Sequence, residues 1–274
     1  MKKNEVISLK KFLDQKLKEY NQHSFIEKDP ISIPHRFTLK QDIEIAGFFA
    51  AIFAWGNRTT IINKCNELIS LMDDSPYDFI VHHKEKELKK FLHFKHRTFN
   101  TTDLLHFIRM LRYHYTKGHY LIASGEPSLE TAFTHSMKKK DADVGNAIRG
   151  FHEYFFSLED SPSRTKKHIS TPANNSSCKR LNMFLRWMVR KDQFGVDFGL
   201  WKSIKPSQLV CPLDVHVQRV AQKLNLSDGE KADWKSALAL TKILKQFDPI
   251  EQRQNSQLPK YYNHNCKEYF FAIE

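Results

Sequence analysis

The chain has 274 residues and a mass of 32.3 kDa, which is enough to bury a core as one large domain or two lobes. A hydrophobic content of 41%, with 21 Phe, excludes an intrinsically disordered chain. The formal net charge of +12 favours a partner rich in phosphate groups, although ordinary surface solubility explains a moderate positive excess almost as well.

The cysteines and the N-terminal residues indicate the compartment. The cysteines are far apart and form no C-x-x-C pair, so we predict no zinc site, no iron–sulfur cluster and no other cofactor. Lysines interrupt the first residues, which argues against a signal peptide. No stretch reaches the roughly 18 apolar residues needed to cross a bilayer. We therefore expect a reduced, cytoplasmic protein without a membrane partner.

Helical spacing begins near the N-terminus. It predicts a helix over residues 5–20, followed by a proline-punctuated loop that carries Arg36. Residues 40–55 are apolar nearly all round, so we expect a buried helix at the centre of the fold. The next helix should begin at Thr59 or Thr60, after a short turn.

Further helices are predicted along the rest of the chain, at residues 76–83, 103–115 with Thr102 as the cap, 127–137, 144–156 and 232–247. Residues 157–177 are polar, contain two prolines and lack periodicity, so we interpret them as the longest loop. Residues 1–249 are predicted to form one helical domain. Residues 250–274 are predicted to form a divergent, flexible tail.

The most informative stretch contains two helices joined by a short connector. In residues 178–190 the apolar side chains fall at helical spacing, which places the polar residues Lys179, Asn182, Arg186 and Arg190 on the opposite face. Asp214 follows Pro212 and precedes a second apolar stripe, so it occupies an N-cap position. A lysine that opens one helix and an aspartate that opens the next can converge on one site.

Residues 179–182 take part in resemblances to two known protein families. The sequence KRLN at 179–182, paired with PLDVHVQRV at 212–220, resembles the Lys/Asp core of the helix-hairpin-helix DNA glycosylase superfamily, which includes endonuclease III and the archaeal 8-oxoguanine glycosylases. The blocks IPHRF, FFAAIFAWGNRTTI and CKRLNMFLRWMVR resemble an uncharacterised bacterial family, domain of unknown function 2400. The chain lacks the glycine-rich hairpin that precedes the lysine in glycosylases, and Asn174, Asn175, Ser176 and Ser177 are candidates to supply its turn and an N-cap.

The glycosylase resemblance implies an all-α fold of two interleaved helical lobes around a cleft, acting as a monomer on duplex DNA with a damaged base. It implies that the Lys179 amine attacks C1′ of an extruded nucleotide and that an ionised Asp214 assists, with subsequent apurinic/apyrimidinic lyase activity. The residues from which we expect nucleic-acid contacts are Arg36, Asn57, Arg58, Arg180, Asn182, Arg186 and Arg219.

Two other functions remain open at this point. A lysine at the start of a helix is usually solvated, and an N-cap aspartate stabilises any helix by about 1 kcal/mol. The chain is therefore also compatible with a non-catalytic nucleic-acid-binding protein, or with an all-helical scaffold that binds other proteins.

Overall fold

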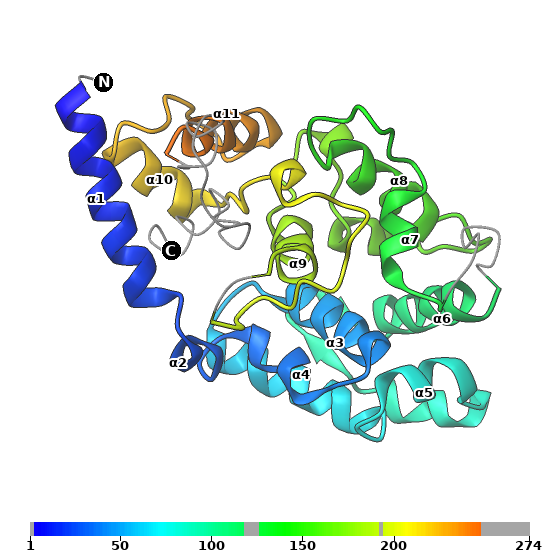
Figure 1. Cartoon of the computed structure of the whole chain (residues 1–274). Helices are drawn as coiled ribbons and strands as arrows, with labels where there is room; N and C mark the ends of the chain where they lie inside the picture. The colour runs from blue at the N-terminus through cyan, green and yellow to red at the C-terminus, as the bar shows by residue number, and fades with distance from the viewer. Residues whose placement is uncertain (1–2, 118–125, 192–193, 248–274) are drawn as a thin grey trace. The chain divides into compact units, whose positions relative to one another are not determined.

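α-Helices account for most of the regular structure in the computed structural model, which describes residues 3–117, 126–191 and 194–247 (Figure 1). The all-α prediction is confirmed, since the strands among these residues form only one small antiparallel hairpin. None of the described helices is both long and apolar enough to span a membrane. The predicted tail at residues 250–274 lies outside the described residues.

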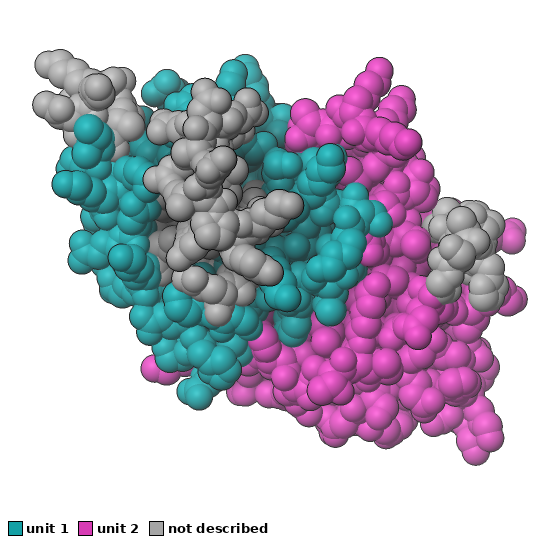
Figure 2. Space-filling view, in the orientation of Figure 1, with its two compact units in different colours: residues 1–27, 172–274 teal, residues 28–171 magenta. Residues whose placement is uncertain are grey.

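The described residues fall into two compact units, which Figure 2 colours separately. Unit 1 takes its residues from 1–27 and 172–274, and unit 2 consists of residues 28–171. Unit 2 is therefore an insertion in the sequence of unit 1. The boundary at residue 172 lies within the segment that we predicted as the longest loop.

Unit 2 is built around one buried helix. Its helices are α3 (Lys40–Phe53), α4 (Arg58–Leu71), α5 (Pro76–His82), α6 (Thr101–Lys117), α7 (Leu129–Thr134) and α8 (Gly145–Phe155). Its strands are β1 (Lys95–His96) and β2 (Phe99–Asn100), and its 3-10 helices are Pro30–Ser32, Pro34–Arg36, Glu85–Phe91 and Ser163–His168. Helix α3 contacts α4 and α5 (Figure 1), and the Phe48 ring on α3 stacks on Phe107 of α6 and meets Phe151 of α8 edge-on. The predicted central helix is confirmed, since α3 is buried from Ile43 onward.

Four predicted helix starts in unit 2, those of α4, α6, α7 and α8, are wrong by one or two residues. Helix α4 begins at Arg58 because the Asn57 side chain caps it by accepting from the Thr60 amide. Helix α6 begins at Thr101, and its first turn is closed reciprocally between Asn100 and Asp103 rather than by Thr102.

The polar segment at residues 157–177, which we predicted as the longest loop, is anchored through one of its short 3-10 helices. The Asp103 carboxylate is fully buried and accepts hydrogen bonds from Arg164 (2.7 Å) and Thr165 (2.8 Å). His168 Nε2 lies 3.3 Å from the same carboxylate. A buried charge needs such partners, and here they come from the 3-10 helix Ser163–His168. The polar composition of this segment therefore reflects internal pairing.

A second buried carboxylate fixes the start of α7. Glu44, on α3, accepts hydrogen bonds from the Tyr115 hydroxyl (3.0 Å), the Leu129 amide (2.9 Å) and the Ser128 hydroxyl. Burial, followed by the charge of Glu44, raises the pKa of Tyr115 well above its usual value. The phenol therefore remains a donor, and Glu44 ties α3, α6 and α7 together.

Unit 1 contains the two helices of the Lys/Asp stretch. Its helices are α1 (Lys3–Tyr20), α2 (His23–Ile26), α9 (Lys179–Val189), α10 (Val215–Lys223) and α11 (Trp234–Lys245), with 3-10 helices at Pro172–Asn174 and Pro206–Gln208. The N-terminal segment is linked to the end of α9 through Arg190, whose Nη2 donates to Asn21 at 3.3 Å and whose Nε donates to Asp197. The Phe184 ring meets Trp201 edge-on, with centroids 5.3 Å apart.

The buried carboxylate of Glu44 gives a stability prediction. Glu44→Ala would leave the Tyr115 hydroxyl, the Ser128 hydroxyl and the Leu129 amide buried without their acceptor. We expect a loss of about 3 kcal/mol in the free energy of unfolding, measured by urea denaturation. The matched control is Glu67→Ala, because Glu67 forms an exposed i,i+3 pair with Lys64 and its removal should change stability by less than about 0.5 kcal/mol. Equal effects of the two substitutions would contradict the role given to Glu44.

Candidate active site

Lys179 and Asp214 meet in unit 1. Lys179 Nζ donates to Asp214 Oδ2 at 2.7 Å, although the two residues open different helices. Their side chains are 26% and 29% exposed, so the pair is enclosed but still accessible to solvent. The predicted convergence of these two residues is therefore a feature of the fold.

The two oxygens of the Asp214 carboxylate accept hydrogen bonds from different donors. Oδ1 caps α10 by accepting from the amides of His216 and Val217, both at 2.9 Å, while Oδ2 accepts from Lys179. Burial alone would raise the pKa of Asp214, but the hydrogen bonds from Lys179, Val217 and His216 outweigh it and lower that pKa below its usual range. The carboxylate is therefore ionised at neutral pH and fixed in orientation.

The turn before Lys179 takes a shape usually found with glycine. Asn175 and Cys178 both have left-handed backbone conformations, with φ of 54° and 52°. The expected turn therefore forms without glycine. The expected side-chain cap does not form. Cys178 occupies the N-cap position of α9, and its side chain makes no capping hydrogen bond.

Ser177 connects this turn to the residue before Asp214. Its hydroxyl donates to the Leu213 carbonyl at 2.7 Å, and the Asn182 amide donates to the Ser177 carbonyl at 2.9 Å. These bonds hold the start of α9 against the chain entering α10. Ser177 was a candidate for the turn and the cap, but its bond to Leu213 could not be predicted, since that partner is a backbone oxygen far along the chain.

Two residues predicted to contact nucleic acid are buried instead. Asn182 is 1% exposed and holds the turn before Lys179. Arg186 is 4% exposed, and its Nε lies 3.5 Å from the buried Asp197 carboxylate. The polar face of α9 is therefore partly enclosed, because Asp197 supplies an internal counter-charge for Arg186.

The other cations predicted in unit 1 remain accessible in part. Arg180 is half-buried, and burial lowers its pKa to about 10, which leaves the guanidinium charged at neutral pH. Arg219 is exposed on α10, five positions after Asp214. Both residues therefore place positive charge on the two helices that begin at the Lys179–Asp214 pair.

The remaining predicted contact residues belong to unit 2. Arg36 is exposed and pairs with Asp74 (2.6 Å) and Asn66 (2.9 Å). Asn57 and Arg58 are exposed at the start of α4, where Asn57 acts as the cap. Arg36 therefore has local partners that a phosphate would have to displace, and Asn57 has a structural task of its own.

Neither a metal site nor an accessible cysteine thiol is found in the part of the chain that the structure describes. No cluster of three or more His, Cys, Asp or Glu side chains with metal-binding geometry occurs among these residues. Cys65, Cys178 and Cys211 are buried as free thiols, and burial raises the pKa of Cys65. Cys266 lies outside the described residues.

One comparison with known proteins gives a match. The family described as "Protein of unknown function (DUF2400)" matches residues 29–251, a range that contains Lys179, Asp214 and all of unit 2 after residue 28. No curated protein and no solved structure matches the chain significantly. The comparisons therefore assign a family without assigning an activity.

The lowered pKa of Asp214 predicts how stability depends on pH. An ionised Asp214 stabilises the fold above its unfolded pKa of about 4, and this contribution is lost as the pH falls through the lower folded-state pKa. Asp214→Asn keeps an oxygen that can cap α10 but removes the charge paired with Lys179. We expect this variant to be less stable than the wild type by about 1 kcal/mol at pH 7, with the difference shrinking as the pH is lowered below about 4.

Urea denaturation of both proteins from pH 7 to pH 3 measures this difference. Asp228→Asn is the matched control, because Asp228 is exposed in the same unit. If the difference in the free energy of unfolding between the wild type and Asp214→Asn stayed constant from pH 7 to pH 3, the lowered pKa of Asp214 would be contradicted.

Proposed function

The chain belongs to the DUF2400 family of proteins of unknown function, and we propose that it is a DNA glycosylase with lyase activity whose active site is the Lys179–Asp214 pair. The observation that carries the proposal is the 2.7 Å contact between these two side chains at the starts of α9 and α10. It joins a primary amine to an oriented carboxylate at a place that solvent can reach. The net charge of +12 supports a polyanionic substrate.

The first chemical step needs an amine without its extra proton. Asp214 Oδ2 already accepts a hydrogen bond from Lys179 Nζ and offers a route by which that proton can leave. The amine nitrogen then attacks C1′ of an extruded nucleotide, and the bond from C1′ to the base breaks. The base leaves with the bonding electron pair and takes up the proton.

The later steps follow from the covalent bond between nitrogen and C1′. Opening of the sugar ring places a proton on O4′ and forms a protonated Schiff base to Lys179. Loss of a proton from C2′ then breaks the bond from C3′ to its phosphate oxygen and nicks the strand. No oxidant, reductant or metal is required for these steps.

Asp214 is suited to stabilise positive charge that develops on the sugar. Its two backbone hydrogen bonds hold the carboxylate before the reaction begins, so little reorganisation is needed at the transition state. Its lowered pKa keeps it anionic at neutral pH. Such an anion is attracted to an oxocarbenium-like sugar.

The proposed DNA contacts differ from the predicted set. We retain Arg180 and Arg219 in unit 1, and Arg36, Asn57 and Arg58 in unit 2, because each is at least partly exposed. Asn182 and Arg186 are removed from the set because both are buried and engaged with Ser177 and Asp197. We assign no residue to recognition of the damaged base.

A non-catalytic nucleic-acid-binding protein is the second candidate. It is favoured by the ion pair itself, because the contact with Asp214 Oδ2 occupies the Lys179 nitrogen that would have to attack the sugar. Under this alternative the pair only joins α9 to α10.

Borohydride trapping tests the chemistry directly. The full chain is incubated with labelled duplexes that carry an abasic site, 8-oxoguanine or other oxidised bases, and with borohydride, which reduces a Schiff base to a stable adduct. We expect a covalent adduct with the wild type and none with Lys179→Gln or Lys179→Arg, since neither replacement can form the Schiff base. Lys223→Gln is the matched control, because Lys223 is exposed on α10, and it should be trapped like the wild type.

The same proteins separate the alternatives when duplex binding is measured by fluorescence anisotropy. Binding without any adduct across the set of lesions would support the non-catalytic alternative. An adduct that persists in both Lys179 variants would eliminate this residue as the nucleophile. Absence of binding at low salt would favour the scaffold interpretation.

A further inference from the structure

Two turns of unit 2 form a stacked surface that the proposed chemistry does not use. The first turn follows α3 and contains Trp55, and the second is the β1–β2 hairpin, whose tip carries Arg97. The Arg97 guanidinium lies over the Trp55 ring, 4.7 Å from its centroid. His96 Nε2 donates to the Phe53 carbonyl at 3.1 Å, which fastens the hairpin to the end of α3.

The backbone of both turns is adapted to this contact. Arg97 has a left-handed conformation with φ of 54°, and Gly56 has φ of 113°. A Cβ atom on Gly56 would lie 2.5 Å from Arg97 Nη1, so any larger residue would push the guanidinium away. Gly56 therefore allows the close approach of Arg97 to the turn beside Trp55.

The hairpin is also supported from within unit 2. Arg164 donates to the Thr98 carbonyl at 3.1 Å and to the Asn100 side chain, while it pairs with the buried Asp103. The tip that presents Arg97 is thus bonded to the core of the unit. A ligand that binds there would not have to order a loose loop.

The surface around this stack is cationic. We define the Trp55–Arg97 corner as Trp55, Asn57, Arg58, Lys95 and Arg97, of which all but the partly exposed Trp55 are exposed. Residues 54–60 and 93–102 contain no Asp or Glu. The Trp55 indole nitrogen itself is buried, so the accessible part of this side chain is its ring.

We propose that the Trp55–Arg97 corner binds single-stranded nucleic acid. An unpaired base stacks on the outer face of the Arg97 guanidinium and extends the stack that Trp55 begins, while Lys95 and Arg58 contact the flanking phosphates. A paired base cannot offer its face in this way, so the corner selects unpaired nucleotides. The site lies wholly in unit 2 and does not rest on the chemistry of Lys179.

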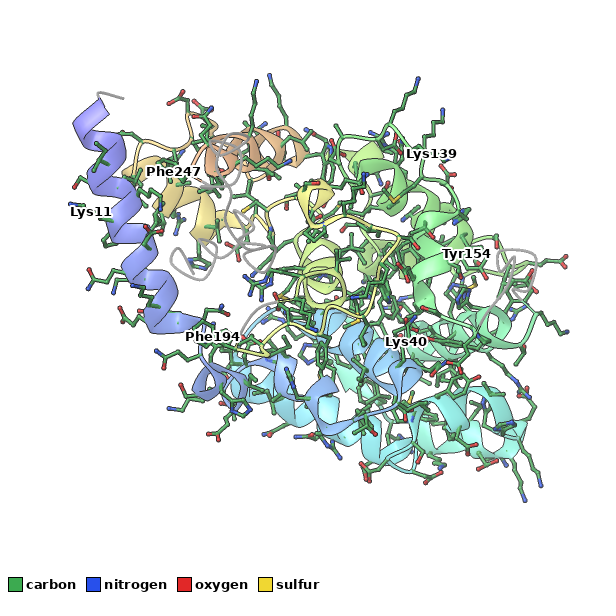
Figure 3. All side chains as sticks on the ribbon, viewed as in Figure 1. Lys11, Lys40, Lys139, Tyr154, Phe194 and Phe247 are labelled. Atoms are coloured by element: carbon green, nitrogen blue, oxygen red, sulfur yellow. The ribbon has the colours of Figure 1, made fainter. Side chains whose placement is uncertain are left out.

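Fluorescence anisotropy with a labelled oligothymidylate and the full chain tests the proposal. We expect Arg97→Ala to weaken binding by about tenfold, because one stacking contact and one charge are lost. Arg97→Lys keeps the charge but not the planar group and should weaken binding by about threefold, with a similar dependence on salt. The matched control is Lys139→Ala, which removes one exposed charge from unit 2 on the segment between α7 and α8 (Figure 3) and should leave affinity within about twofold.

Intrinsic fluorescence gives a second readout that depends on the corner. Trp187, Trp201 and Trp234 are buried, so quenching by the oligonucleotide should come from Trp55 and disappear in Trp55→Phe. Lys223→Gln, which removes one exposed charge from α10 in unit 1, should bind the oligonucleotide like the wild type, whether or not borohydride trapping succeeds for any protein. The proposal is overturned if both Arg97 variants, folded by circular dichroism, bind as tightly as the wild type, or if binding leaves Trp55 fluorescence unchanged.

Discussion

The Asp214 carboxylate is the constraint on which the candidate site depends. Its Oδ1 atom satisfies two amides at the start of α10, and its Oδ2 atom accepts from Lys179. Burial disfavours the ionised carboxylate, but the hydrogen bonds from Lys179, Val217 and His216 outweigh this effect and lower the pKa of Asp214. Because the Ser177–Leu213 bond holds the same two chain segments together, the position of Lys179 relative to α10 does not depend on the ion pair alone.

Local signals were sufficient for much of the fold. The apolar run in residues 40–55 predicted α3 and its burial, since a helix with no polar face must be enclosed. Pro212 and the apolar stripe after Asp214 predicted the cap of α10, because capping involves only the next three residues. The Lys/Asp motif then predicted which two helix starts would meet, which periodicity alone could not.

The wrong predictions concern partners that are distant or irregular in the sequence. A helical pattern groups Asn182, Arg186 and Arg190 on one face of α9, but it does not say what packs against that face. Asp197, in a segment without periodicity, supplies the counter-charge for both arginines. The composition of residues 157–177 predicted a loop but not its anchor, because that anchor is the buried Asp103 on α6. Polar residues mark a solvated surface only when no internal charge pairs with them.

Lys179 and Asp214 differ in how well a substitution can separate an effect on the fold from an effect on the proposed reaction. Asp214 both caps α10 and pairs with Lys179, so a substitution that removes its side-chain oxygens would alter the helix start as well as the proposed reaction. The cap oxygen Oδ1 accepts from two backbone amides, so a neutral side chain at position 179 leaves both capping amides satisfied. In the proposed reaction the amine must leave Oδ2 to reach C1′, and the Ser177–Leu213 bond holds the starts of α9 and α10 together independently of the ion pair. Lys179, the proposed nucleophile, is therefore the residue whose replacement tests the proposed chemistry with the least disturbance of the fold.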